Sequence, residues 1–169
     1  MLAWGQKVSQ AFRDRVNHIS LALRVNPDYL MTVMAFETGC TFSPRIVNKA
    51  GSGAIGLIQF MPDTAHALGT STEELSKMSA EDQLDYVYKY FKASAGKMRS
   101  LSDVYFAVLL PSAVGKSETS VVFDSRDPKY PKRYIQNKGL DIDKDGLITK
   151  SEVVSLVRPY LVEGMKYAA

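Results

Sequence analysis

Apolar residues at helical spacing, with almost no alternating strand pattern, constrain the fold of this 169-residue chain more than any other feature. The first such series runs from Val8 to Leu23, in the steps of three and four that place side chains on one face of a helix. Only residues 121–123 could be extended, in a small hairpin or bridge within residues 112–130. We therefore predict an all-α fold in a single domain, residues 1–169.

A second helix is predicted to follow, with signals at both of its ends. Asn26 suits the N-cap, Pro27 suits the first helical position, and Gly39 should end a helix over residues 28–38. Because this helix is apolar on nearly every side, it should lie at the centre of the core.

The stretch after the second helix should be less regular. Residues 39–53 are rich in Gly, Ser, Pro and Asn and are predicted to form a loop. Helical segments are expected over residues 55–68, with a break around Pro62, because proline removes a backbone donor. Gly69 should close this stretch.

Hydroxyl side chains mark the starts of later helices. Three of them are followed three positions later by an acid, as in a helix capping box: Ser71, Ser79 and Thr149. Further helices are predicted over residues 80–95 and 103–110, with Ser102 as the N-cap of the second.

The segment DIDKDGLITKSE, residues 141–152, has the spacing of an EF-hand calcium loop. Calcium takes roughly six to eight hard oxygen ligands, and Gly146 permits the sharp turn that the loop needs. Ile148 is apolar and should point into the protein interior. The predicted ligands, with a carbonyl in place of a side chain at Leu147, are Asp141, Asp143, Asp145, Leu147 and Glu152.

Sensor hands usually occur in pairs, and this chain has one such loop. We therefore predict a structural Ca²⁺ that holds the C-terminal helix, residues 150–164, against the rest of the protein. The alternative is an acidic surface turn that binds nothing.

The residue with the strongest catalytic potential is Glu37, which follows the apolar run of residues 33–36 near the end of the second helix. Burial favours the neutral form of a carboxylic acid and raises its pKa, as a proton donor to a glycosidic oxygen requires. Considered by its spacing alone, Glu37 is more typical of an ordinary carboxylate at a helix end.

Three segments around Glu37 together resemble the soluble lytic transglycosylase family. Its pattern is Glu-Ser, then Gly-Ala-x-Gly-Leu-Met-Gln, then Pro-x-Thr-Ala. This chain has Glu37-Thr38, GAIGLIQ over residues 53–59 and MPDTA over residues 61–65. The resemblance covers residues 29–92. It implies a lysozyme-like helical fold and cleavage of the β-1,4 bond between N-acetylmuramic acid and N-acetylglucosamine in peptidoglycan.

The resemblance further implies that Glu37 works without a second carboxylate. Most glycosidases use two, but the next acid along the chain, Asp63, occupies a position that varies in the family and is interpreted as a helix-start residue. Glu37 would protonate the leaving oxygen and then accept a proton from the muramyl C6 hydroxyl, giving a 1,6-anhydro product. The alternatives are a hydrolytic muramidase on the same fold and a noncatalytic, calcium-dependent wall-binding module.

Five residues are expected to contact the substrate: Thr38, Gly56, Gln59, Tyr105 and Tyr134. Glycine lets the backbone approach a sugar, and a glutamine offers both a donor and an acceptor. The family's later Ala-Tyr-Asn-x-Gly is replaced by AVLLP in residues 107–111, so Tyr105 would have to compensate for the missing tyrosine. Tyr134 is the candidate for the tyrosine beside the catalytic glutamate, with Tyr130 as the alternative.

Composition adds weaker constraints. The formal charge of +3 comes from cations spread along the chain, which suits an anionic polymer such as a cell wall but gives no block that indicates nucleic acid. Cys40 is the only cysteine, so no intrachain disulfide can form.

The chain has no apolar run long enough for a signal peptide or a membrane span. It therefore resembles bacteriophage endolysins or virion-associated lysins. This resemblance implies a monomer made in the host cytoplasm and delivered to the periplasm or cell wall by a holin or a virion.

Overall fold

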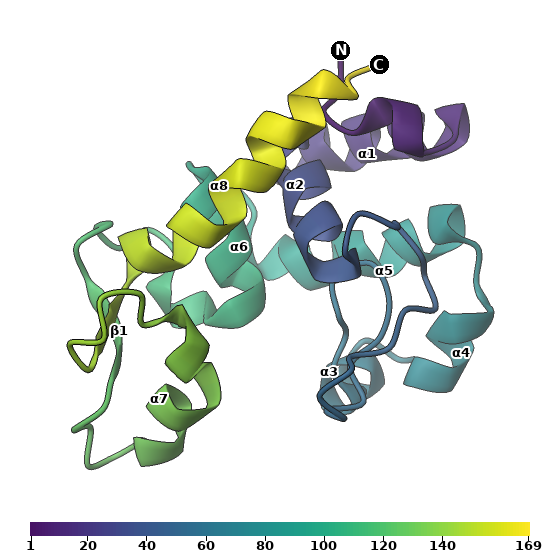
Figure 1. Cartoon of the computed structure of the whole chain (residues 1–169). Coiled ribbons are helices and arrows are strands. Elements are labelled where there is room, and N and C mark those ends of the chain that lie inside the picture. Colours follow the sequence, from purple (N-terminus) through teal and green to yellow (C-terminus); the bar gives the residue numbers. More distant parts are fainter.

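The computed structural model describes residues 1–169 and consists mainly of α-helices (Figure 1). The helices are α1 (Gln10–Leu23), α2 (Pro27–Thr38), α3 (Pro62–Ala67), α4 (Thr72–Lys77), α5 (Ala80–Phe91), α6 (Leu101–Leu109), α7 (Pro131–Asn137) and α8 (Lys150–Lys166). Short 3-10 helices are η1 (Gly5–Lys7), η2 (Lys92–Ser94), η3 (Pro111–Ala113) and η4 (Lys138–Leu140). Two strands, β1 (Val121–Asp124) and β2 (Leu147–Thr149), complete the fold. No helix is both long and apolar enough to cross a membrane.

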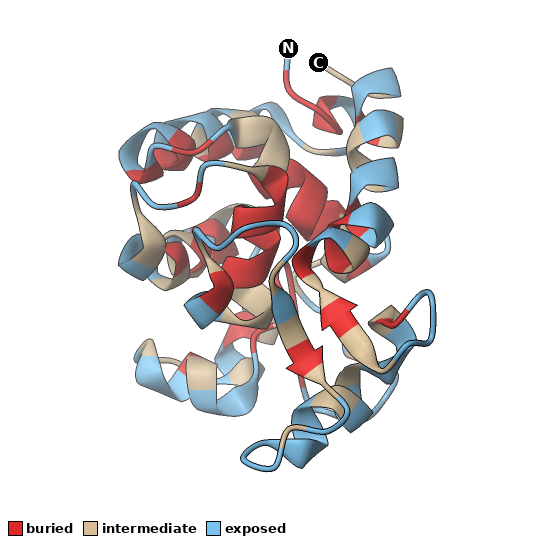
Figure 2. Ribbon diagram, turned by 90° about the vertical axis from the view of Figure 1, so that its left-hand side faces the viewer, coloured by how far each residue is buried: buried red, intermediate tan, exposed pale blue.

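The helix α2 lies at the centre of the molecule, as the sequence predicts. Its residues from Leu30 to Ala35 are all buried, and α1, α6 and α8 pack around it (Figure 2). At its start, the Asn26 side chain accepts a hydrogen bond from the Asp28 N–H at 2.9 Å. At its end, Gly39 has a φ of 58°, which glycine adopts without strain. Both predicted caps are confirmed.

The segment before Pro62 is not helical, so the prediction of helix over residues 55–61 is wrong. Ile55 forms isolated bridges with Val47 and Phe60, which fold the segment into a tight turn. Gly56 has a φ of 82° in this turn, a value incompatible with a right-handed helix. The helix α3 begins only where Pro62 occupies its first position.

The hydroxyl caps are confirmed at three of four predicted positions: Ser71, Ser79 and Thr149. The fourth prediction is wrong, because Ser100 caps α6 by accepting a hydrogen bond from the Asp103 N–H at 3.1 Å. Ser102 instead lies buried inside this helix. The helix predicted over residues 80–95 also ends earlier than expected, at Phe91.

The two strands form one small antiparallel sheet, with Phe123 opposite Ile148. The partner of residues 121–124 thus lies in the acidic loop near the C-terminus, rather than within residues 112–130. Ile148 is fully buried, which confirms its predicted inward orientation.

A buried ion pair joins α6 to the start of α8. The Lys150 ammonium lies 2.5 Å from the Asp103 carboxylate, and it also donates hydrogen bonds to the carbonyl oxygens of Ala113 and Lys116. Asp103 in turn accepts a hydrogen bond from the Gly115 N–H at 2.8 Å. These contacts satisfy both charges inside the protein, as stable burial of a charge requires.

The two ends of the chain lie side by side (Figure 1). The Leu2 N–H donates to the Ala169 carbonyl at 2.7 Å, and the Trp4 N–H donates to the Gly164 carbonyl at 2.8 Å. The Trp4 indole N–H also donates to the Tyr160 carbonyl at 2.9 Å. The N-terminal segment therefore holds the far end of α8.

Replacement of Lys150 by methionine should lower the free energy of unfolding by about 3–5 kcal/mol, because it leaves a buried carboxylate without its partner. Urea denaturation would measure the loss. Lys166→Met is the matched control, since Lys166 pairs with Glu163 on the exposed surface. It should cost less than about 1 kcal/mol. Equal losses in the two variants would contradict this account of the buried pair.

Candidate active site

Glu37 lies in the last turn of α2, where the central helix reaches the surface. The surrounding protein removes most of the water from its carboxyl group, and this burial raises the pKa of Glu37 to about 7. Burial is the only cause of the shift, so no neighbouring charge contributes to it. The carboxyl group can therefore change protonation state near neutral pH.

A hollow of about 610 Å³ lies beside Glu37. Its lining comes from the end of α2, from the following loop and from the turn before α3: Glu37, Thr38, Gly39, Thr41, Ile46, Val47, Asn48, Lys49, Ala50 and Gln59. Glu37 is the only acid in this lining. Asp63 is exposed in the first turn of α3, where an acid favours the helix N-terminus.

Two tyrosines are close enough to Glu37 for its charge to affect them. Burial is the main reason why the pKa values of Tyr90 and Tyr105 are raised, and the negative charge of Glu37 raises both further. The Tyr105 ring packs edge-on against Phe36 with centroids 5.2 Å apart. The Tyr90 hydroxyl donates to the Ala107 carbonyl at 2.6 Å. Both phenols therefore stay neutral beside Glu37.

The predicted contact Gln59 lies in the same hollow, partly exposed, with a φ of 55°. Its side-chain nitrogen donates to the carbonyl oxygens of Ile46 and Gly56, both at 3.1 Å. Because these two bonds use both amide hydrogens, the remaining group for a sugar is the side-chain carbonyl, which accepts hydrogen bonds. Gln59 was expected to offer the sugar both a donor and an acceptor, but in the structure only its acceptor is free.

Two predicted sugar contacts, Thr38 and Gly56, have structural roles in the loop beside Glu37. The Thr38 hydroxyl is buried, donates to the Met34 carbonyl at 2.7 Å and accepts from the Phe42 N–H at 3.0 Å. Gly56 is also buried, and a Cβ atom there would overlap the Gln83 amide. Both residues shape the loop beside Glu37, and their contact with sugar stays a prediction.

Tyr134 is not the tyrosine beside Glu37. Its hydroxyl donates to the Asp141 carboxylate at 2.6 Å, in the acidic loop. The tyrosines whose pKa values respond to the charge of Glu37 are Tyr105, which was predicted, and Tyr90, which the sequence did not predict. No local pattern distinguishes Tyr90 from its neighbours on α5, because its position depends on how α5 and α6 pack.

The acidic loop brings three carboxylates together. Oxygen atoms of Asp141, Asp143 and Asp145 all lie within 4.8 Å of one another. One Asp141 oxygen is buried without a hydrogen-bond partner, while the other accepts from the Gly146 N–H at 3.0 Å. Glu152 accepts from the Ile142 N–H at 3.0 Å and so closes the loop onto α8. An unpaired buried oxygen among carboxylates suits a hard cation.

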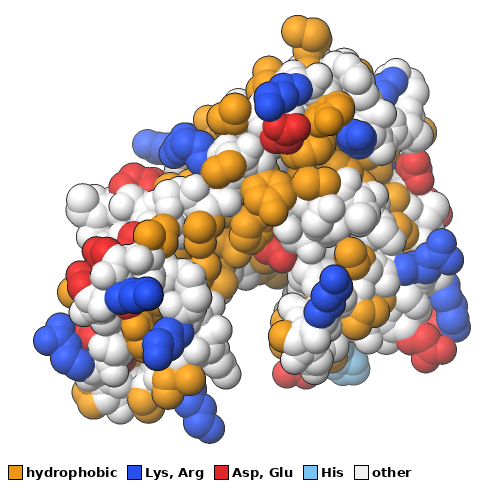
Figure 3. All heavy atoms as spheres, in the orientation of Figure 1, with side chains coloured by type: hydrophobic (Ala, Val, Ile, Leu, Met, Phe, Trp, Pro, Cys, Tyr) orange, Lys and Arg blue, Asp and Glu red, His pale blue; other side chains and the backbone are white.

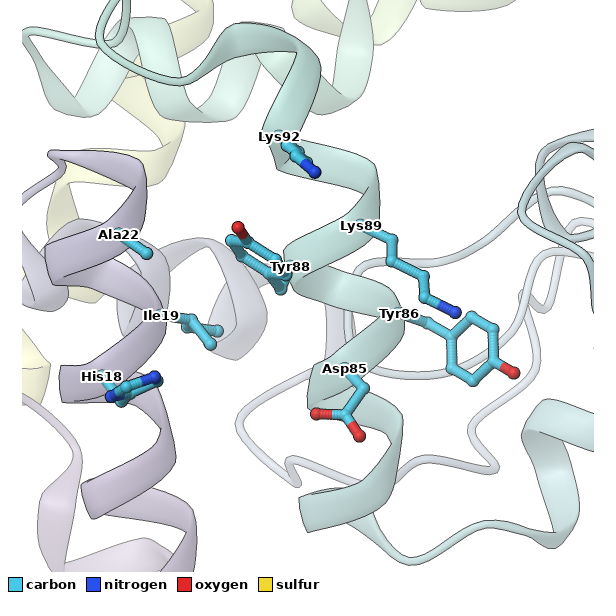
Figure 4. A pocket seen from close by; sticks show the side chains of 8 residues that line it. All are labelled: His18, Ile19, Ala22, Asp85, Tyr86, Tyr88, Lys89 and Lys92. Carbon is cyan, nitrogen blue, oxygen red and sulfur yellow. The ribbon is translucent and has the colours of Figure 1, made fainter.

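A separate hollow of about 580 Å³ lies between α1 and α5 (Figure 4). It shares no lining residue with the hollow at Glu37. Its only acid, Asp85, pairs with Arg15 at 2.9 Å, and Lys89 lies over the Tyr86 ring at 4.6 Å. With its acid already paired, this hollow offers no group suited to cleaving a glycosidic bond.

Comparison with known proteins gives the class of the chain. The family model described as Transglycosylase SLT domain matches residues 15–110, which include Glu37, Gln59, Tyr90 and Tyr105. No curated protein matches the chain. Because the match spans more than half of the chain, the protein belongs to the transglycosylase SLT domain family. It is a glycan-cleaving enzyme, a peptidoglycan lytic transglycosylase.

Proposed function

We propose that this enzyme cleaves the MurNAc–GlcNAc β-1,4 bond with Glu37 as its only acid and base, and that the product carries a 1,6-anhydromuramyl end. The observation that carries the proposal is the isolation of Glu37, the only acid lining its hollow. A hydrolase of the common kind places a second carboxylate across the bond to activate water or to attack the sugar. Intramolecular attack needs no such group.

The proton transfers follow from the raised pKa of Glu37. In its neutral form, Glu37 donates a proton to the glycosidic oxygen as the bond to C1 breaks. The resulting carboxylate accepts the proton of the C6 hydroxyl while that oxygen bonds to C1. A pKa of about 7 allows both steps near neutral pH. The attacking oxygen already belongs to the sugar, so its approach to C1 loses little entropy.

Three neighbours support Glu37 in this proposal. Tyr105 and Tyr90 stay neutral near Glu37, because burial and the charge of Glu37 both raise their pKa values, so neither phenol adds a second negative charge to the site. The carbonyl oxygen of Gln59 accepts a hydrogen bond from the substrate, for example from an N-acetyl N–H.

Product analysis should find anhydromuramic ends in wall digested by the wild-type enzyme. Glu37→Gln should lower the rate by a factor of about 10²–10⁴, because the amide can neither donate nor accept the proton in the same way. Mass spectrometry of the released fragments measures both effects. Asp63→Asn is the matched control and should keep the wild-type rate and product.

Reducing ends that have gained one water would show that the enzyme is a hydrolytic muramidase. Wall binding with no cleavage, unchanged by Glu37→Gln, would indicate a noncatalytic module. Either result would contradict the proposal.

We further propose that the acidic loop binds a structural Ca²⁺. The ligands would be the carboxylates of Asp141, Asp143, Asp145 and Glu152 and the carbonyl of Leu147. The support is the sequence spacing, the cluster of carboxylates and the unpaired buried oxygen of Asp141. When bound, the ion would neutralise these carboxylates and link the loop to the start of α8.

Removal of calcium with EGTA should lower the melting temperature by about 5–10 °C, because a ligand bound only by the folded state stabilises it. Differential scanning calorimetry measures the change. Asp143→Asn should abolish most of the response to EGTA. Glu118→Gln is the matched control, since Glu118 is exposed and lies outside the loop, and it should respond like the wild type. An unchanged midpoint in the wild type would contradict a structural ion.

Delivery by a holin or a virion, a bacteriophage origin and a monomeric state stay predictions from the resemblance.

A further inference from the structure

One segment of the chain, residues 126–138, has a large excess of basic over acidic residues, and we call it the basic segment. It includes α7 and contains five of the 21 basic residues of the chain but only one of the 18 acidic residues. Without this segment the rest of the chain would be slightly acidic, so the formal charge of +3 comes from here. The cations are spread along the sequence, but the excess of positive over negative charge lies in this segment.

Most of these cations have no internal partner. Arg126 lies 3.5 Å from Asp124, but the ion pairs of the structure include none of the other four: Lys129, Lys132, Arg133 and Lys138. All four are exposed. Positive charges without internal partners are available to an anionic ligand.

An aromatic ring lies among the cations. Tyr130 is 41% exposed, with the Arg133 guanidinium 3.8 Å and the Lys129 ammonium 5.2 Å from the centre of its ring. Ile135, on the helix α7 that follows Tyr130, is 69% exposed. The basic segment thus combines positive charge with apolar surface, which suits a ligand that has carboxylates attached to an organic chain.

The position of the basic segment connects it to the substrate. A deep hollow separates the part of the molecule that contains α7 from the part that contains α3, and α2 runs toward the head of this gap (Figures 1 and 3). Several Lys and Arg side chains lie over the α7 side, and others lie on the opposite side of the gap (Figure 3). The hydrogen bond from Tyr134 to Asp141 fixes α7 to the acidic loop. The basic segment therefore lies on the α7 side of the gap.

We propose that the basic segment binds the carboxylates of the peptide stems in peptidoglycan. The glycan backbone of this polymer is largely neutral, whereas each peptide stem on a muramic acid ends in a carboxylate and often carries others. The proposal rests on the glycan cleavage proposed for Glu37. A strand lying in the hollow would bring its stems to the α7 side, where several weak, solvent-exposed pairs would add to its affinity.

The test uses a triple variant of the basic segment, Lys129→Gln/Lys132→Gln/Arg133→Gln. The matched control removes three positive charges outside the segment, in Lys92→Gln/Lys97→Gln/Arg99→Gln. All six side chains are exposed. The substrates are intact peptidoglycan and peptidoglycan whose peptide stems an amidase has removed. Rates are measured against substrate concentration at low ionic strength, and the products are identified by mass spectrometry.

On intact peptidoglycan, the basic-segment variant should raise the apparent KM about tenfold, with kcat and the anhydro product unchanged. On the stripped glycan it should match the wild type, and the control should match the wild type on both substrates. The difference on intact substrate should shrink at about 1 M NaCl, where charges are screened beyond about 3 Å.

An unchanged KM on intact substrate would overturn the proposal, as would an equal rise on both substrates. A third arm measures binding to phosphatidylglycerol vesicles. If the variant loses only vesicle binding, the basic segment recognises an anionic lipid surface and the proposal is wrong. Failure of the Glu37 mechanism would appear separately, as reducing ends with the KM difference still present.

Discussion

The helix α2 is apolar on nearly all of its sides, and this constraint determines the arrangement of the whole molecule. Such a helix is stable only when neighbours cover every face, and α1, α6 and α8 provide that cover. The same enclosure removes water from Glu37 at the end of the helix and raises its pKa to about 7. The chemistry of the site is thus a direct consequence of how the core is packed.

The helix α8 connects the acidic loop with the active site. At its start, Lys150 pairs with Asp103 on α6, two residues before Tyr105. Further along, the Tyr160 ring packs edge-on against Phe36, which also contacts Tyr105 (centroids 5.1 and 5.2 Å apart). A displacement of α8 would therefore also displace the aromatic rings near Glu37. An ion that holds the start of α8 in place would therefore also help to keep these rings in position.

Local signals in the sequence predicted the helices, several of their caps and the residue at the centre of the site. Asn26, Gly39 and Thr149 act through neighbours a few residues away, so their roles could be inferred without a fold. The turn before Pro62 was mistaken for helix because apolar residues in a buried turn can imitate helical spacing. Its left-handed residue, Gly56, gave the contrary signal.

The features of the site that the sequence did not predict depend on contacts between residues far apart in the sequence. Lys150 occupies an ordinary position in the acidic loop, and only the fold reveals its pairing with Asp103. The sequence favoured Tyr134 or Tyr130 over Tyr90 as the partner of Glu37, because only the packing of α5, α6 and α7 decides which phenol comes near. Nor could the spacing of the cations indicate on which side of the gap the basic segment lies.

The most direct test of the central claim is a titration of Glu37 by ¹³C NMR of the side-chain carboxyl, assigned by comparison with Glu37→Gln. The account predicts a midpoint near pH 7, with the neutral acid present below that pH, because burial in the folded protein disfavours the charged form. A midpoint near 4.5, the ordinary value for a glutamate, would show that the carboxyl group is hydrated. Glu37 could then not serve as the proposed proton donor at neutral pH.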